Sequence, residues 1–218
     1  MSKTITIIGA SGLIGNEVLQ LAMENKEIER ITIFVRKSLH LNNPKLIEVI
    51  TDFKNLNDLE TKINGDALIC CLGTTRKKTP NLEEYKKIDF DLTINLAQIA
   101  KKQNIEQVHL ISAIGADSKS KIFYNRLKGE TEVALINIGF PQTIIYRPSL
   151  LIGKRNEYRF GELLAQKLSP IFDLLLIGSL KKYHSISASD IAKTIVNRVL
   201  RKGQKVEVLE YNEIQLPK

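Results

Sequence analysis

Three polar residues just past the middle of the chain have the types and the spacing of a proton-transfer site. Ser112 directly follows an apolar run, Val108–Ile111, and Tyr124 and Lys128 lie in a later helical pattern. Residues at positions i and i+4 share one face of a helix, so the phenol and the ammonium are expected to be neighbours. A serine at the end of a neighbouring strand could point to the same place.

The lysine determines what the tyrosine could do. A free phenol, with a pKa of about 10, is a poor acid–base catalyst at neutral pH. An ammonium about 5 Å away, at an effective dielectric constant of about 20, stabilises a phenolate by roughly 3 kcal/mol, or about two pKa units. Tyr124 could then exchange a proton with a carbonyl oxygen that Ser112 holds by a hydrogen bond. Taken alone, this spacing is equally typical of a half-buried tyrosine beside a solvated lysine.

A glycine-rich turn at the start of the chain predicts which ligand these residues act beside. The stretch 9–15, GASGLIG, follows a β-branched run, Ile5–Ile8, and precedes a helical pattern. This is the context of a dinucleotide-binding loop, although the glycines are spaced three and three residues apart. Gly9 would permit the turn, Gly12 the approach of a pyrophosphate, and Gly15 the packing of helix on strand. The residues assigned to the loop, whose N–H groups would face the phosphates, are Gly9, Ser11, Gly12, Leu13, Ile14 and Gly15. A purely structural turn is the alternative.

The end of the second strand pattern, Arg30–Arg36, indicates which dinucleotide is preferred. It lies about 20 residues past the last glycine, where an NAD site places a carboxylate on the ribose. This chain has Arg36 and Lys37 there instead. A guanidinium can bind a 2′-phosphate through two hydrogen bonds, so NADP(H) is predicted over NAD(H). The alternative is a solvated arginine at a strand end.

Two further strand ends are expected to contribute to the cofactor site. After Leu46–Ile50 comes Asp52, which could hold an adenine amino group or stabilise a turn. After Ala67–Leu72 comes Gly73, whose missing side chain would let the backbone pass close to a ligand. The residues assigned to these two places are Asp52, Phe53, Gly73, Thr74 and Thr75.

Alternating strand and helix patterns predict an α/β fold, a Rossmann-type doubly wound parallel sheet. Besides those already named, the strands expected are Thr143–Tyr146 and an edge strand over Val206–Tyr211. Five helices are expected. One starts at Asn16, one follows the capping box Asn81–Glu84, and one runs from about Phe90 to Gln103. The other two run from about Tyr124 to Gly139 and from the cap Ser187–Asp190 onward. Asn95, in the helix from Phe90, is expected to be exposed.

Composition narrows the class of protein. The chain has 218 residues, 43% hydrophobic and 26% charged, which predicts one soluble domain over 1–218. With the glycine-rich turn at 9–15, this is expected to be a single NAD(P)-binding domain. No apolar run is long enough to span a bilayer, and no signal peptide precedes the first strand, so a cytoplasmic location is expected. Cys70 and Cys71 are adjacent within an apolar run, which is not a disulfide framework, and no metal site is expected.

The formal net charge of +8 raises the question of nucleic-acid binding. The lysines come in scattered pairs, such as Lys86-Lys87 and Lys181-Lys182, and no nucleic-acid motif accompanies them. Nucleic acid is therefore not expected as a partner. Attraction of a phosphate-bearing cofactor is a sufficient use for part of this charge.

Several motifs together resemble a known family. They are GASGLIG at 9–15, CCLGTTR at 70–76, GAD at 115–117, YNRLKGE at 124–130 and Arg147-Pro148. Over about two thirds of the chain it resembles the atypical short-chain dehydrogenases/reductases, in particular the HIV Tat-interacting oxidoreductase-like branch. The resemblance implies NADPH binding and a Ser112-Tyr124-Lys128 site, in which Tyr124 and Lys128 also bind the cofactor. It further implies backbone contact of Arg147 and Pro148 with the nicotinamide end. A second serine common in the branch is Ala113 here, and some members of the branch are regulatory binding proteins.

The segment after Pro148 is expected to select the substrate. Residues 149–185 would form most of a small C-terminal substrate or partner lobe, and their apolar run Ile171–Ile177 is too short to cross a membrane. Contact of this lobe with a membrane surface or a protein partner is the lesser alternative. The resulting hypothesis is an NADPH-dependent oxidoreductase that reduces a small carbonyl substrate. The alternative is a non-catalytic, NADPH-sensing binding protein. A protein partner or a homodimer is left open by the sequence.

Overall fold

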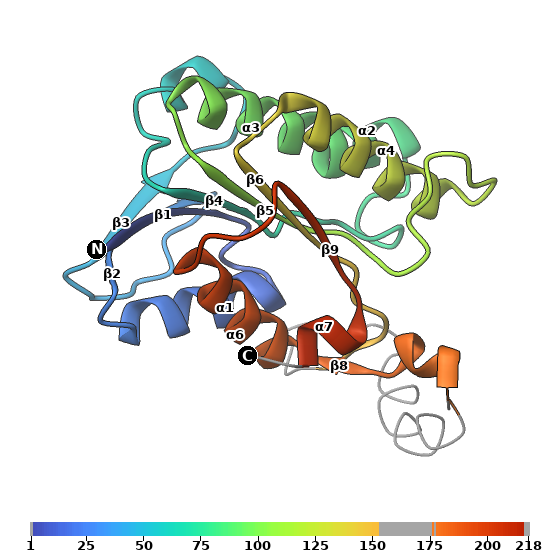
Figure 1. Ribbon diagram of the computed structural model, residues 1–218. Helices are drawn as coiled ribbons and strands as arrows, with labels where there is room; N and C mark the ends of the chain where they lie inside the picture. The colour runs from blue at the N-terminus through green and yellow to red at the C-terminus, as the bar shows by residue number, and fades with distance from the viewer. Residues whose placement is uncertain (1, 153–175, 177, 216–218) are drawn as a thin grey trace.

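A parallel β-sheet forms the middle layer of the protein, with helices on both of its faces (Figure 1). Within residues 2–152, 176 and 178–215, which the computed structural model describes, the sheet has seven strands in the order β3-β2-β1-β4-β5-β6-β9. The strands are β1 (Lys3–Ile8), β2 (Ile28–Val35), β3 (Leu46–Ile50), β4 (Ala67–Cys70), β5 (Gln107–Ile111), β6 (Gln142–Tyr146) and β9 (Val206–Leu209). The α/β fold with a doubly wound parallel sheet is thus confirmed.

The inner strands carry the continuous apolar runs that a sheet covered on both faces requires. All residues of β4, β5 and β6 are buried. The two edge strands differ, because Ile50 of β3 and Val208 of β9 are exposed by 63% and 40%. The edge position predicted for the last strand is therefore confirmed.

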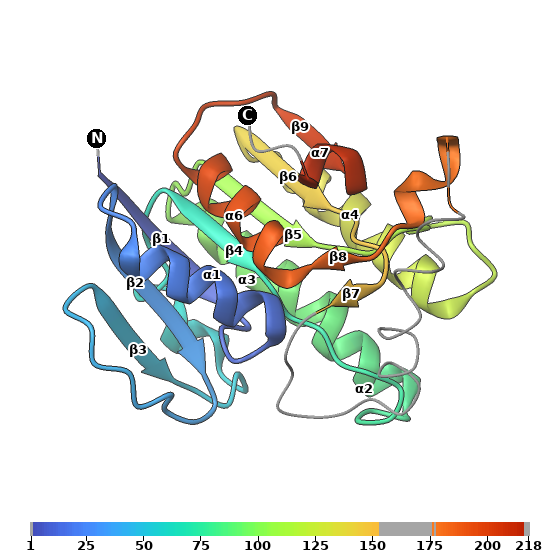
Figure 2. The same cartoon turned by 90° about the horizontal axis from the view of Figure 1, so that it is seen from below.

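Each face of the sheet is covered by its own set of helices (Figures 1 and 2). On one side lie α1 (Leu13–Glu24), α6 (Ala188–Val199) and α7 (Tyr211–Gln215). On the other lie α2 (Leu82–Lys86), α3 (Leu92–Lys102) and α4 (Phe123–Ile138). A separate apolar core fills the space between the sheet and each helical layer.

Local sequence signals place most helix boundaries correctly. The side chain of Asn81 caps α2 by accepting the N–H groups of Glu83 and Glu84. Ser187 caps α6 through the N–H of Asp190, and Gly139 ends α4 in the left-handed conformation, with φ 76°. These boundaries agree with the predicted capping signals.

The helix expected near Phe90 differs from the prediction in one respect. It is continuous with α2 through a π-helical turn, η2 (Lys87–Asp91), and becomes α-helical again at Leu92. Asn95 is exposed, as expected, whereas Asp89 in the π-helical turn is buried.

Only the two ends of the predicted lobe fall within the described part of the chain. There, β7 (Leu151–Ile152) pairs in parallel with β8 (Ile186–Ser187). The apolar run predicted over 171–177 lies, apart from Leu176, outside the described residues. Among the helices that are described, none combines the length and the apolar character needed to cross a bilayer.

Candidate functional site

The order of the strands reverses between β1 and β4, so the loops that follow these two strands diverge toward opposite faces of the sheet. In open parallel sheets, ligands bind at this point, outside the carboxyl ends of the strands. Ile8 of β1 is paired with Cys70 of β4, so the two strands end together. Both glycine-containing loops that the sequence assigned to a nucleotide therefore begin at the same place.

The turn after β1 depends on glycine at two positions. Gly9 has φ +84°, and a Cβ built on it would lie 2.6 Å from the backbone carbonyl of Cys71. A Cβ on Gly15 would overlap the carbonyl oxygen of Gly9. Gly15 therefore lets α1 pack against the turn itself rather than against the strand, which refines its predicted role. Gly12 donates its N–H to the carbonyl oxygen of Gly9 at 3.0 Å.

The N-terminus of α1 has the properties of an anion site. Gly12 is the N-cap residue and is exposed, and no side chain caps the helix. The first turn, which contains Leu13, Ile14 and Gly15, has no acidic residue. The first N–H groups of a helix lack intrahelical acceptors and carry partial positive charge. With Ser11 exposed beside them, these groups fit the pyrophosphate of a dinucleotide.

The end of β2 presents cations to solvent. Arg36 and Lys37 are both exposed, and within the described residues neither forms an ion pair. A nearby carboxylate, Glu48 of β3, is already engaged. Its oxygens accept the hydroxyl of Ser38 at 2.6 Å and the N–H of Leu39 at 2.8 Å. These hydrogen bonds, chiefly that from Ser38, hold the pKa of Glu48 below its ordinary value.

Asp52 occupies the turn after β3. It is exposed, accepts the N–H of Lys54 at 3.0 Å and lies 3.4 Å from the ammonium of Lys54. This is the turn-stabilising arrangement that the sequence left as one alternative. Phe53 has a positive φ of 62° and packs partly against the core between the sheet and α3.

In the loop after β4, Gly73 leaves space for a ligand, whereas Thr74 and Thr75 form hydrogen bonds within the protein. A Cβ on the exposed Gly73 would come no closer than 3.8 Å to a protein atom, the Oδ1 of Asp89, so a ligand could approach there. Thr74 donates its N–H to Asp89 Oδ2 at 2.8 Å, and its carbonyl accepts the hydroxyl of Tyr85 at 3.1 Å. The hydroxyl of Thr75 accepts the N–H of Lys78 at 3.2 Å. The two threonines thus hold the shape of the loop.

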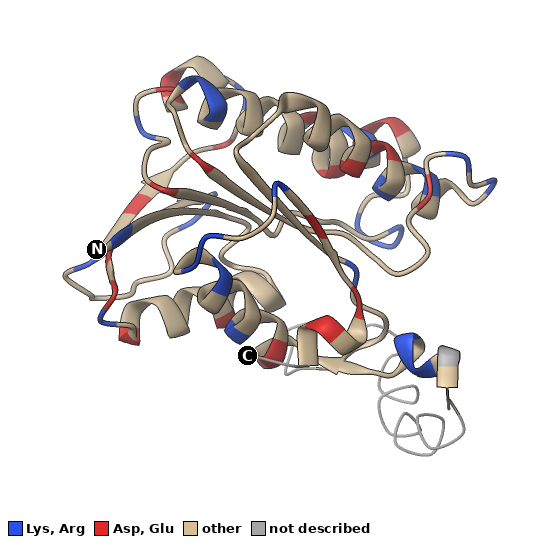
Figure 3. Ribbon diagram, viewed as in Figure 1, with Lys and Arg blue, Asp and Glu red and all other residues tan. Residues whose placement is uncertain are grey.

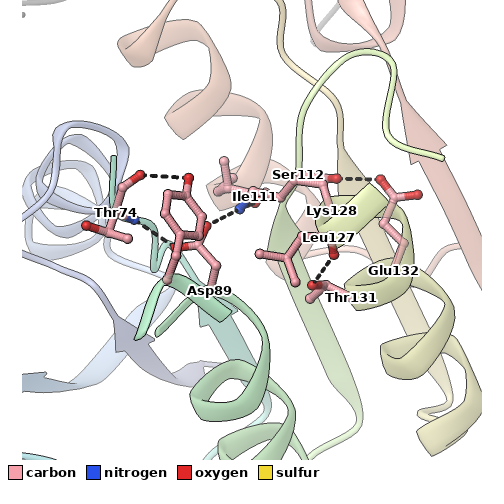
Figure 4. Close-up of polar contacts among 9 residues, drawn as sticks. Thr74, Asp89, Ile111, Ser112, Leu127, Lys128, Thr131 and Glu132 are labelled. Carbon is pink, nitrogen blue, oxygen red and sulfur yellow. Dashed lines mark hydrogen bonds and ion pairs between the residues drawn. The ribbon is translucent and has the colours of Figure 1, made fainter. Parts of the chain in front are cut away.

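Lys128 lies at the centre of the candidate site and is only 5% exposed (Figure 4). Its ammonium is 3.1 Å from Asp89 Oδ1 and donates to the carbonyl of Ile111 at 3.5 Å. Burial by itself lowers the pKa of Lys128, but the negative charge of Asp89, with smaller effects of Tyr124 and Glu132, raises it above its ordinary value. The lysine is therefore a buried cation with a buried counter-ion.

Tyr124 lies one helical turn before Lys128 on α4 and is 40% exposed. An electrostatic interaction joins it to Lys128. Tyr124 is thus partly exposed, whereas Lys128 is buried. The structure thus brings together the tyrosine and lysine that the sequence paired.

Ser112 is buried and its hydroxyl is engaged. It donates to Glu132 Oε1 of α4 (Figure 4). The same carboxylate binds the guanidinium of Arg147 through two hydrogen bonds, at 3.0 and 2.5 Å. The carbonyl of Pro148 accepts the N–H of Ile114 at 2.9 Å. Arg147 and Pro148 therefore fix the ends of β5 and β6 relative to each other.

Sequence analysis did not identify two residues of this site, Asp89 and Glu132. Asp89 is 2% exposed and follows the buried Tyr85 by four residues, with the buried Thr93 four residues further on. A carboxylate within such a buried helical stripe was the available signal. Glu132, 4% exposed, carried the same signal on α4, four residues after Lys128.

Charged residues are otherwise spread over the molecule. Figure 3 shows lysine and arginine in both helical layers and in the connecting loops. Among the described residues, no group of three or more His, Cys, Asp or Glu side chains could hold a metal ion.

Several known proteins are similar to this chain in sequence and in fold. A family described as NAD(P)H-binding matches residues 9–202. The protein FMP52, mitochondrial, of Candida albicans is 30% identical over 197 residues, which cover 88% of this chain and 85% of that protein. The protein HTATIP2 of Rattus norvegicus is 28% identical over 218 residues, covering 98% and 88%.

Solved structures agree on the fold. A UDP-N-acetylglucosamine 4-epimerase from Methanobrevibacter ruminantium, in complex with UDP-N-acetylmuramic acid, has a TM-score of 0.71 at 15% identity and covers 96% of this chain and 76% of that one. WbmH of Bordetella bronchiseptica, in complex with NAD+, has a TM-score of 0.70 at 17% identity, covering 95% and 75%. The family match and the relatives place the chain in the NAD(P)H-binding family of atypical short-chain dehydrogenases/reductases.

Proposed function

We propose that this protein is an NADPH-dependent oxidoreductase that reduces a small carbonyl substrate. The observation that carries this proposal is the pairing of an exposed phenol, Tyr124, with a buried ammonium, Lys128, at the carboxyl edge of the sheet. The anion-binding turn of α1 opens at the same edge, after β1. A proton donor beside a nucleotide site supports carbonyl reduction as the reaction.

Each residue has a distinct role in this reaction. NADPH, when bound, would supply the hydride that adds to the carbonyl carbon. Tyr124 gives its proton to the carbonyl oxygen, and the charge of Lys128 stabilises the phenolate that remains. The same ammonium is the proposed anchor for a ribose hydroxyl. Ser112 is the proposed hydrogen-bond donor to the carbonyl oxygen, a role for which its hydroxyl must first break its hydrogen bond to Glu132.

The preference for NADP(H) rests on the end of β2. Arg36 and Lys37 are exposed there and form no ion pair within the described part of the chain. The nearby Glu48 is held by Ser38 and Leu39, so it is not free to accept a ribose hydroxyl. A guanidinium in this position matches a 2′-phosphate.

The test is NADPH oxidation across a panel of aldehydes, ketones and quinones, with wild type compared with Tyr124→Phe. Because Tyr124 is partly exposed, the variant should fold, and its affinity for NADPH is measured separately by calorimetric titration. Loss of its general acid should lower kcat by about 100-fold or more. Equal rates for the two proteins would remove Tyr124 from the mechanism.

A second candidate function is a non-catalytic, NADPH-sensing binding protein. It is favoured by the engagement of two site residues, since Ser112 donates to Glu132 and Lys128 is paired with Asp89. Tight NADPH binding without turnover on the panel, and recovery of a protein partner or a homodimer only with NADPH present, would support it. Turnover by the purified protein alone would count against it.

We also propose that the protein functions in a reducing compartment such as the cytoplasm. Cys70 and Cys71 are both free thiols, and burial raises the pKa of Cys70 to about 12, which keeps it protonated. Fractionation of cells that express the tagged chain tests the location, and recovery of the protein in mitochondria would contradict a cytoplasmic one.

A further inference from the structure

The π-helical turn η2 brings a carboxylate into the protein interior. Its central residue, Asp89, is 2% exposed, in contrast to Asp91 of the same turn, which is partly exposed. A single π-helical turn within an α-helix is rare, and such turns occur often at functional sites. Both the turn and the buried carboxylate therefore call for a physical reason.

Both oxygens of Asp89 are directed at candidate site residues (Figure 4). Oδ2 accepts the N–H of Thr74 at 2.8 Å, in the loop after β4. Oδ1 lies 3.1 Å from the ammonium of Lys128. One carboxylate thus joins the loop that borders the nucleotide site to the helix that carries Tyr124 and Lys128.

The charge of Lys128 depends on its surroundings. An ammonium that is 5% exposed loses most of its hydration, which favours the neutral amine. Three groups act against this: Asp89 from η2, and Tyr124 and Glu132 from α4. Asp89 contributes most among them and alone forms an ion pair with Lys128 in the described structure.

We propose that Asp89 is a positioning residue that keeps Lys128 charged beneath Tyr124 and fixes the loop after β4 to this pair. The catalytic meaning of this role rests on the proposed reductase function. Its physical content does not, because the state of Lys128 can be measured without cofactor or substrate. Asp89 acts through Lys128 and through Thr74, and it gives no proton to the substrate.

The first experiment compares Asp89→Asn with Asp91→Asn, a matched change of the partly exposed aspartate two residues away. An asparagine keeps an oxygen for the N–H of Thr74 but removes the charge. The ammonium of Lys128 is followed by NMR of lysine-labelled, cofactor-free protein, and its signal is identified by its absence in Lys128→Arg. Asp89→Asn should let Lys128 lose its proton at lower pH, with an ionisation constant about tenfold larger or more. Asp91→Asn should leave it unchanged. The same titration in all three proteins would overturn the proposal.

The second experiment measures reduction kinetics as a function of pH. Asp89→Asn should lower kcat about tenfold or more at neutral pH. As the pH is raised, the activity of this variant should begin to fall at a lower pH than that of wild type, because its Lys128 deprotonates earlier. KM for the carbonyl substrate should change little, because Asp89 does not contact the substrate site. If no variant reduces any carbonyl, the proposed function fails, and the NMR titration alone decides the role of Asp89.

Stability provides a check in case Asp89→Asn does not fold. Removing one partner of a buried ion pair leaves an uncompensated charge, whereas removing both does not. The double variant Asp89→Asn/Lys128→Met should therefore have a higher urea midpoint than Asp89→Asn. A double variant no more stable than the single one would contradict the pairing.

Discussion

Gly15 lies so close to the carbonyl oxygen of Gly9 that no side chain fits between them. The start of α1 is therefore packed directly on the turn that precedes it. Because the obstacle is backbone, it cannot move aside as a flexible side chain would. The nucleotide loop and the first turn of the helix form one rigid unit.

Gly15→Ala should therefore destabilise the protein. Overpacking of this kind costs about 1–3 kcal/mol of the free energy of unfolding, which urea denaturation measures. Gly73→Ala is the matched control, since a Cβ there comes no closer than 3.8 Å to a protein atom. It should leave the unfolding free energy unchanged and weaken NADPH binding. Equal stability of wild type and Gly15→Ala would contradict the rigid unit.

Arg36→Ala should weaken NADPH binding selectively. Loss of a charge-assisted contact to the 2′-phosphate costs about 1.5–3 kcal/mol, whereas NADH, which lacks this phosphate, should bind nearly as before. Arg30→Ala removes an exposed arginine from the other end of β2 and serves as the control. Calorimetric titration with NADPH and with NADH compares the affinity of each variant, Arg36→Ala and Arg30→Ala, with that of wild type. Unchanged NADPH affinity in Arg36→Ala would assign this arginine to solvent.

Ser112→Ala should affect stability as well as turnover. The buried Glu132 keeps its two hydrogen bonds from Arg147 but loses the one from Ser112, and a hydrogen bond to a charged group contributes about 1.5–3 kcal/mol. Tyr124→Phe, at a partly exposed position, should leave the unfolding free energy nearly unchanged. Urea titrations of the two variants beside wild type check this contrast. A Ser112→Ala protein as stable as wild type would mean that its hydroxyl does not support Glu132.

Glu48 should make a contribution to stability that depends on pH. Hydrogen bonds from Ser38 and Leu39 lower its pKa in the folded protein, so the contribution is present above the ordinary glutamate pKa of about 4.3. It is lost as the pH falls through the lower, folded-state value. The urea midpoint of Glu48→Gln should therefore lie below that of wild type at pH 7, and the gap should narrow in strong acid. A gap that is the same at both pH values would argue against these hydrogen bonds.

Local signals in the sequence account for most of the fold. The β-branched runs predict the inner strands because each is short, apolar and followed by a turn residue. Asn81, Ser187 and Gly139 mark helix ends through bonds within a few residues of themselves. Such features depend on neighbouring residues in the sequence, so they can be recognised without knowing the tertiary structure.

Local sequence signals do not identify the partners of the candidate site residues. Lys128 pairs with Asp89, 39 residues earlier, and Ser112 donates to Glu132, 20 residues later. Neither choice follows from helix or strand periodicity. The π-helical turn that directs Asp89 inward also has no sequence rule comparable to a helix cap. The types of the site residues could be predicted, and helix periodicity could have marked Asp89 and Glu132 as buried, but the partner of each carboxylate could not be predicted.

The packing of α1 along α6 has a consequence for synthesis of the protein (Figure 2). The nucleotide loop is synthesised well before α6, which covers the helix after this loop and begins only at Ala188. Until then, the apolar face of α1 lacks its later neighbour. Because segments are made in the order of the sequence, we expect α1, and with it the nucleotide loop, to reach its final packing only after α6 has been synthesised.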